Sequence, residues 1–175
     1  MIEVELRSFV TKEQYEKLLD FFKSEAKLLK DDNQETHYFS GENDLRIQKN
    51  NYFSKIWMKK GKIHDESREE IELKFPTEDF GKLQDLFESL GYKVYIKWFR
   101  DRKQFDWNGI DVSLDHTKGY GNIIEMELLV KEENEKADAL QRLKDKFAHL
   151  GIDITPKEVF NEKFNYYKEN WRSLV

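Results

Sequence analysis

Residues 2–7 read Ile-Glu-Val-Glu-Leu-Arg, a strict alternation of apolar and charged side chains. Successive side chains of a β-strand point to opposite faces, so the two glutamates, Glu3 and Glu5, share one face and the apolar residues share the other. The Glu-x-Glu pattern returns at 124–128, and residues 68–74 place further charges on one face of another strand. One such strand is typical of a solvated sheet edge, but three of them favour a single site built from paired carboxylates.

Length and composition indicate a folded, soluble domain. The 175 residues include 13 Phe, 8 Tyr and 4 Trp, so we expect one domain over 1–175 with a sizeable core. The absence of Cys excludes disulfides and thiolate sites. The sequence has no apolar run of about 18 residues, so we expect neither a secretion signal nor a membrane span. We therefore expect a cytoplasmic protein, a monomer or homodimer without a membrane partner. The net charge of −5 argues against nucleic-acid binding.

Hydrophobic periodicity predicts alternating strands and helices. The expected helices are 12–30, 77–90, 133–150 and 156–172. The expected strands are 2–7, 36–39, 45–48, 54–60, 68–75, 94–104, 110–115 and 124–128. Thr11 with Gln14 and Thr155 with Glu158 predict capping boxes, and Asn108-Gly109 predicts a two-residue hairpin turn.

The polar faces of these strands collect acids and bases in equal number. The acids are Glu3, Glu5, Glu70, Glu72, Asp111, Asp115, Glu125 and Glu127; the bases are Arg7, Arg46, Lys55, Lys59, Arg68, Lys74, Arg100 and Arg102. On an open sheet this face would be solvated surface, and within a barrel the charges could simply pair with one another. Because the helices can cover only the apolar side, we favour a curled sheet with its charges inside.

Such an interior suits a metal-triphosphate site. Clustered carboxylates repel one another, and hard divalent cations such as Mg²⁺ or Mn²⁺ relieve that repulsion. Arg and Lys side chains instead hold the oxygens of a polyphosphate. We therefore expect a small-molecule triphosphate as the partner.

The order of short motifs resembles the CYTH, or triphosphate tunnel, family of class IV adenylyl cyclases, thiamine triphosphatases and inorganic triphosphatases. Residues 3–7 are similar to its opening Glu-x-Glu-x-Lys, 45–48 to its Leu-Arg-Ile-Arg strand, and 58–61 to its Tyr-Lys-Gly strand end. Further similar segments are the basic strand at 100–102, the Leu-Asp at 114–115, and the Gly-x-Gly through Glu-x-Glu at 119–127. Four departures are Arg7 for Lys, Gln48 for Arg, Lys60 inserted before Gly61, and Tyr120 for Leu.

The resemblance implies an α+β fold, an eight-stranded antiparallel β-barrel or tunnel with a charged lumen and helices packed outside. It implies metal ligation by Glu3, Glu5, Glu125 and Glu127, helped by Asp115 and Glu72. The expected substrate-binding residues are Arg7, Arg46, Lys55, Lys59, Arg68, Arg100 and Arg102, and the expected catalytic residues are Glu5, Arg7, Lys59 and Arg102.

Three functions fit these residues. The first is metal-dependent hydrolysis of inorganic, thiamine or nucleoside triphosphate, which requires no reading of a base or ribose. The second is cyclisation of ATP to cyclic AMP and pyrophosphate, and the third is non-catalytic binding of a polyphosphate or nucleotide. Strand parity also places Trp57 on the charged face between Lys55 and Lys59, where it would stack on an organic group or narrow the tunnel. The alternative is a bulge at Asn50-Asn51 that turns Trp57 under a helix.

Overall fold

The computed structural model describes residues 2–59 and 70–175. Its strands are β1 (Ile2–Val10), β2 (Lys27–Phe39), β3 (Asp44–Lys49), β4 (Ser54–Lys59), β5 (Glu70–Phe75), β6 (Val94–Trp107), β7 (Ile110–Thr117) and β8 (Gly121–Val130). Its helices are α1 (Lys12–Glu25), α2 (Phe80–Ser89), α3 (Lys136–His149) and α4 (Lys157–Leu174), with short 3-10 turns η1 (Thr77–Asp79) and η2 (Glu133–Glu135).

The strands form one antiparallel sheet in the order β1-β8-β7-β6-β2-β3-β4-β5. This confirms the expected α+β class with eight antiparallel strands. In the part of the chain that is described, β1 and β5 end the order, so hydrogen bonds do not close the sheet. The chain forms two compact units. Unit 1 is Met1–Asp31 with Asp101–Tyr167, and unit 2 is Asp32–Arg100 with Lys168–Val175. The long strands β2 and β6 run through both.

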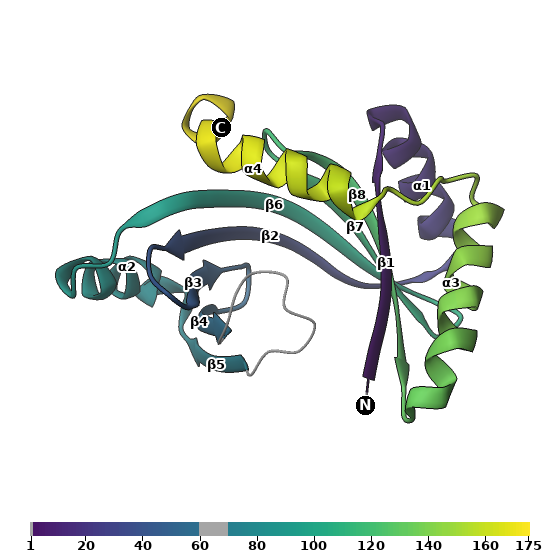
Figure 1. Ribbon diagram of the computed structural model, residues 1–175, viewed down its shortest axis with the longest axis horizontal. Coiled ribbons are helices and arrows are strands. Elements are labelled where there is room, and N and C mark those ends of the chain that lie inside the picture. Colours follow the sequence, from purple (N-terminus) through teal and green to yellow (C-terminus); the bar gives the residue numbers. More distant parts are fainter. Residues whose placement is uncertain (1, 60–69) are drawn as a thin grey trace. The chain divides into compact units, whose positions relative to one another are not determined.

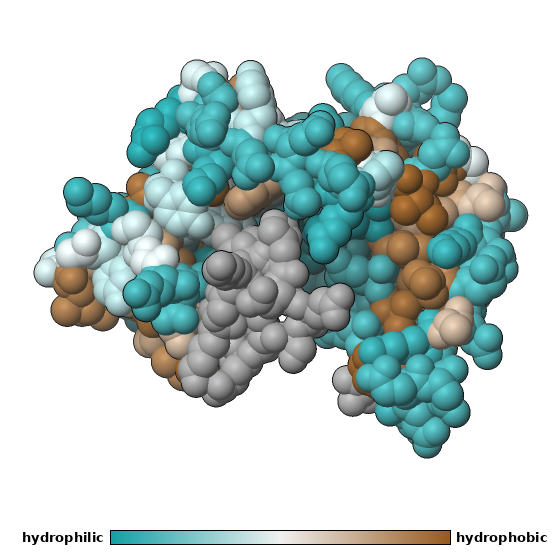
Figure 2. All heavy atoms as spheres, in the orientation of Figure 1, coloured by the Kyte–Doolittle hydropathy of each residue, from teal (hydrophilic) through white to brown (hydrophobic). Residues whose placement is uncertain are grey.

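In unit 1, helices cover the apolar face of the strands. Figure 1 shows α1 and α3 together beside β1, and the core of this unit lies between these helices and β1, β7 and β8. The aromatic residues Phe22 and Phe105 stack there, with ring centroids 5.7 Å apart, and neither is exposed to solvent. Figure 2 shows apolar residues gathered beside α3, whereas hydrophilic residues dominate the outer surface of that helix. The charged residues of β1, β7 and β8 therefore lie on the opposite face of the strands, which these two helices do not cover.

Helix α1 begins as expected and ends earlier. The Thr11 side chain accepts a hydrogen bond from the Gln14 backbone N–H (3.1 Å), and the Gln14 side chain accepts one from the Thr11 N–H (2.9 Å), confirming the capping box. The predicted end at residue 30 is wrong: Ala26 is already extended, and β2 starts at Lys27. Residues 27–30 have reasonable helix propensity, but strand pairing in the sheet overrides it.

The turn between β6 and β7 has the predicted conformation. Asn108 has φ 55° and Gly109 has φ 79°, the pair of positive values that a type I′ hairpin turn requires. The Gly109 N–H also donates to the Asp106 side chain (2.8 Å). This tight turn fixes the register of the two strands that carry Arg102 and Asp115.

Thr155 has a different role from the predicted helix cap. Its hydroxyl contacts the hydroxyl of the fully buried Ser8 (2.8 Å) and accepts the backbone N–H of Phe9 (2.9 Å). These bonds attach the start of α4 to the end of β1, two segments about 145 residues apart in sequence. Thr77 is likewise not the cap of α2 but the first residue of η1.

In unit 2, the apolar face of β2 to β4 packs against α2. Leu45 and Ile47 join Phe39, Phe80 and Leu83 in one buried cluster, which confirms the predicted inward faces of β3. Ile56 and Met58 of β4 pack against the same cluster. Trp57 between them must point to the opposite, polar face, so the alternative in which a bulge turned it under a helix is wrong.

No helix within residues 2–59 and 70–175 combines the length and apolar character that a membrane span needs.

Candidate functional site

The acidic residues of unit 1 lie in adjacent rows across three strands. Glu5 of β1 pairs with Glu127 of β8, and Glu127 pairs on its other side with Asp111 of β7. One step along, Glu125 lies between Arg7 and Ser113. Directly opposed side chains in an antiparallel sheet have Cβ atoms about 5 Å apart, so these carboxylates share one small surface.

This crowding changes the acidity of Glu127. Partial burial, followed by the negative charges of Glu3, Asp111, Glu125 and Glu5, raises the pKa of Glu127 from 4.5 to about 7. A proton or a cation at this place relieves the same repulsion. The paired glutamates predicted from sequence alternation are therefore electrostatically one cluster.

The donor chemistry of this cluster fits a hard divalent cation, because glutamate oxygens are the ligands that Mg²⁺ and Mn²⁺ prefer. Within the described residues, no three acidic or histidine side chains already converge on one point as a complete ligand set. Exposed Glu3 and Glu5 retain freedom to rotate toward an ion. The residues thus match a metal by type and by shared charge, and ion binding would draw their side chains together.

The raised pKa predicts how stability depends on pH. Folded Glu127 holds its proton more tightly than the unfolded chain does, so its contribution to stability is complete below pH 4.5 and is lost as pH rises toward about 7. Without metal, the melting temperature of the wild type relative to Glu127→Gln should fall across this interval. Added Mg²⁺ should raise the wild-type melting temperature more at pH 8 than at pH 5. A difference between the two proteins that stays constant with pH would contradict the clustering.

Arg102 and Asp115 form a two-point ion pair. Arg102 Nε and Nη2 donate to the two Asp115 carboxylate oxygens, each at 2.7 Å, and Arg102 Nη2 lies 3.7 Å from Glu125 Oε1. Burial opposes the charged guanidinium, but the hydrogen bonds and the negative charge of Asp115 outweigh it, so the pKa of Arg102 is raised. Arg102 thus joins β6 to the acidic rows. Asp115, an expected metal helper, already contacts this cation.

The sequence did not single out two neighbours of the site in unit 1. The Gln104 side chain donates to Asp111 Oδ2 at 2.6 Å, and Phe160 of α4 lies under the Arg7 guanidinium, 4.6 Å from its ring centroid. Gln104 could have been found by parity, since it lies two residues after Arg102 on the same strand. Phe160 gave no such signal, because its role depends on where α4 attaches.

In unit 2, a row of four side chains crosses β2 to β5. Tyr38 pairs with Arg46, Arg46 with Trp57, and Trp57 with Glu72. The Arg46 guanidinium lies 4.3 Å from the Tyr38 ring centroid and 4.5 Å from that of Trp57. Asp44, which the sequence did not suggest, accepts from Arg46 Nε at 2.7 Å.

Lys55 and Glu72 lie beside this row. Lys55 Nζ is 2.7 Å from Glu72 Oε2, and Lys74 Nζ is 3.5 Å from Glu72 Oε1. Burial alone would raise the pKa of Glu72, but the hydrogen bond and charge of Lys55 lower it. Glu72 is therefore a partner of two lysines within unit 2. Gln48 donates to Thr36 Oγ1 at 3.0 Å, so this position contributes a neutral hydrogen bond.

Three further basic residues were predicted to bind substrate: Arg100, Lys59 and Arg68. Arg100 on β6 is partly buried, with its guanidinium 5.8 Å from the Trp98 ring centroid. The backbone of Lys59 pairs with Asp44 and Glu70 at the ends of β3 and β5. Arg68, and with it the departure at Lys60-Gly61, lies outside the described residues.

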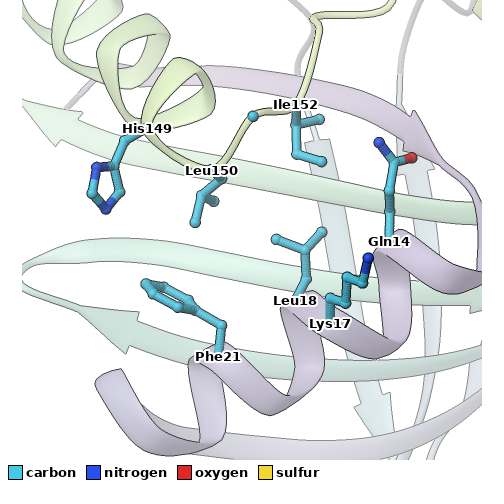
Figure 3. A pocket seen from close by; sticks show the side chains of 8 residues that line it. Gln14, Lys17, Leu18, Phe21, His149, Leu150 and Ile152 are labelled. Atoms are coloured by element: carbon cyan, nitrogen blue, oxygen red, sulfur yellow. The ribbon is translucent and has the colours of Figure 1, made fainter.

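A separate cavity of about 310 Å³ lies in the helical layer of unit 1. Figure 3 shows Leu18 and Phe21 of α1 pointing toward Leu150 and Ile152, with Lys17 at one side. Apolar side chains form most of its wall, so it lacks the set of cations that phosphate groups require.

Comparison with known proteins identifies the family. A profile of the CYTH domain matches residues 1–158, which include most of both units. The chain belongs to the CYTH domain family. This assignment confirms the family resemblance read from the order of the short motifs.

Relatives of this CYTH protein agree in fold and in length. A Methanocaldococcus jannaschii protein named "Putative adenylate cyclase" is 30% identical over 165 residues, covering 87% of this chain and 91% of its own. The structure of a Pyrococcus horikoshii protein of unstated function has a TM-score of 0.68 and 27% identity, with 93% and 99% of the two chains covered. A Vibrio parahaemolyticus structure described as a putative adenylate cyclase has a TM-score of 0.65 and 17% identity, with 92% and 98% covered. That last likeness shows the fold alone.

Proposed function

We propose that this CYTH protein is a divalent-metal-dependent triphosphatase. The observation that carries the proposal is the row of Glu5, Glu127 and Asp111 across β1, β8 and β7, with the Arg102 guanidinium beside it. Neighbouring carboxylates that raise the pKa of Glu127, together with a fixed guanidinium, suit a ligand that contains both cations and phosphate oxygens.

The glutamates of unit 1 are the proposed metal ligands: Glu3, Glu5, Glu125 and Glu127. When bound there, Mg²⁺ or Mn²⁺ would neutralise phosphate charge and polarise the phosphoryl group. We assign Asp115 a different task, because its bidentate contact holds the Arg102 guanidinium in one orientation. Glu72 similarly holds Lys55.

The proposed phosphate-binding residues are basic side chains in both units. Arg7 and Arg102 belong to unit 1, and Arg46, Lys55, Lys59 and Arg100 belong to unit 2. The remaining proposed residue, Arg68, lies outside the described residues. Arg102 and Arg46 are each held at one edge by an aspartate and keep further N–H groups for phosphate oxygens. Their fixed planes reduce the entropy lost when a phosphate binds. Within unit 1, Arg7 and Arg102, with Glu5, are the residues we expect at the reacting phosphoryl group.

Hydrolysis is the first choice because it needs only a metal, a phosphate chain and water. The side chains that we assign to the site are carboxylates and cations, which recognise the metal and the phosphates. Cyclisation requires in addition that a ribose 3′-hydroxyl be held at the α-phosphate. It remains the second candidate because the M. jannaschii relative carries the name "Putative adenylate cyclase".

One product assay tests the proposal. Purified protein is incubated with inorganic triphosphate, thiamine triphosphate or ATP, each with Mg²⁺ and with Mn²⁺, and phosphate, pyrophosphate and cyclic AMP are resolved. We expect release of inorganic phosphate, and none after metal removal by EDTA. Cyclic AMP with equimolar pyrophosphate from ATP would instead establish the cyclase. When carboxylates of the site are replaced by alanine, Glu16→Ala serves as the matched control, because Glu16 is an exposed acidic residue on α1.

A further inference from the structure

Trp57 contacts two of the proposed phosphate-binding cations. Arg46 lies across the strand pair, 4.5 Å from the indole centroid, and Lys55 Nζ lies 4.8 Å from the same ring. Both cations approach within the distance at which an aromatic quadrupole attracts a positive charge. Trp gives the strongest such attraction among the aromatic side chains.

Arg46 is further restrained on its other sides. Tyr38 contacts the guanidinium at 4.3 Å, and Asp44 binds its Nε edge. The Arg46 side chain is 12% exposed and that of Asp44 is 1% exposed. Two aromatic rings and one carboxylate therefore fix the plane of the guanidinium, and the Nη1 group is not part of the bond to Asp44.

Lys55 is restrained in the same way with fewer contacts. Its ammonium group has Glu72 at 2.7 Å and Trp57 beneath it, and its side chain is 16% exposed. Arg46 and Lys55 would repel each other in a region largely removed from water. The indole that contacts both attracts each cation and thereby offsets part of this repulsion.

We propose that Trp57 is a positioning residue that holds Arg46 and Lys55 for the phosphate chain of the substrate, and that its ring is not a platform for a base. This inference rests on the proposed function and makes the site selective for the polyphosphate part of a ligand. A nucleobase or thiamine ring would have to compete with these two cations for the surface of the indole. The sequence suggested two roles for Trp57, stacking on an organic group of the substrate and narrowing of the tunnel. The contacts with Arg46 and Lys55 favour a third role, the positioning of these cations.

The test compares Trp57→Leu and Trp57→Phe with the wild type. Binding of inorganic triphosphate and of ATP is measured by calorimetry, and KM and kcat are measured for both. Trp57→Leu should weaken the binding of both ligands equally, by about five- to tenfold, and should raise KM more than it lowers kcat. Trp57→Phe retains a weaker ring and should recover part of the loss. Weaker binding of ATP alone, with unchanged inorganic triphosphate, would establish stacking and overturn the proposal.

A control and a ligand-free measurement separate the outcomes. Phe53 contacts Lys74 at 4.8 Å, a lysine that the proposal does not use, so Phe53→Leu should leave both affinities unchanged. The Arg46 Nε–H resonance, measured by NMR without ligand, should shift in Trp57→Leu because the ring current is lost. A wild type that turns over triphosphate while Trp57→Leu binds it equally well would overturn the positioning role alone. A wild type that neither binds nor turns over any triphosphate would overturn the proposed function as well.

Discussion

Glu5→Ala and Glu127→Ala should each reduce turnover of a triphosphate by about three orders of magnitude or more. Removing one carboxylate from a hard-cation site lowers the number of ligands and the negative charge together, and metal-assisted stabilisation of phosphate charge contributes several kcal/mol. The two residues are directly paired across β1 and β8, so they should have similar effects despite their distance in sequence. Steady-state rates at saturating Mg²⁺ and at saturating Mn²⁺ check this result.

Loss of activity in these variants should not come from unfolding. Glu127 contributes repulsion in the metal-free protein at neutral pH, so Glu127→Gln should match or exceed the wild type in melting temperature. Glu5 is exposed, and its removal opens no cavity in the core. Full activity of either alanine variant, or of the native protein in excess EDTA, would refute a metal site on this face.

Arg102→Ala should be the most damaging change among the basic residues. It removes a proposed phosphate ligand and also leaves the Asp115 carboxylate, which is 3% exposed, without its bidentate partner. Breaking a buried ion pair from one side typically costs about 3 kcal/mol or more of stability. Arg102 is itself 22% exposed, so we expect about 2–3 kcal/mol in denaturant unfolding.

A second variant separates the two roles of Arg102. Arg102→Ala combined with Asp115→Asn also removes the carboxylate charge that Arg102 balances in the wild type, so part of the lost stability should return. Triphosphate binding, measured by calorimetry, should remain weak because no guanidinium occupies the site. If the double variant regained both stability and binding, Arg102 would be a structural residue only.

Much of the fold could be predicted because its signals are local. The alternation in β1, the capping box of α1 and the Asn108-Gly109 turn each depend on neighbouring residues, and each is present as predicted. The same parity placed Trp57 on the polar face of β4. Propensity failed at residues 27–30, where long-range strand pairing replaced the end of the predicted helix.

The composition of the candidate site could be predicted more fully than its contacts. Periodicity gave the list of carboxylates and cations on the polar faces, but several of their contacts join residues far apart in sequence. Glu5 pairs with Glu127, and Ser8 with Thr155. Asp44 and Gln104 were missed because aspartate and glutamine are common on the polar face of a strand. Only their contacts with Arg46 and Asp111 connect them with the candidate site.

The sequence by itself determined which side chains share a strand face, since that depends only on the two-residue period of an extended chain. The order of its short motifs also carries the resemblance to the CYTH family, which the family match confirms. Only the tertiary structure decided which of those charges meet. The raised pKa of Glu127, the bidentate hold of Asp115 on Arg102, and the two cations at Trp57 each arise from strand register. Register brings charges within a few ångströms across strands, and no single stretch of sequence encodes that distance.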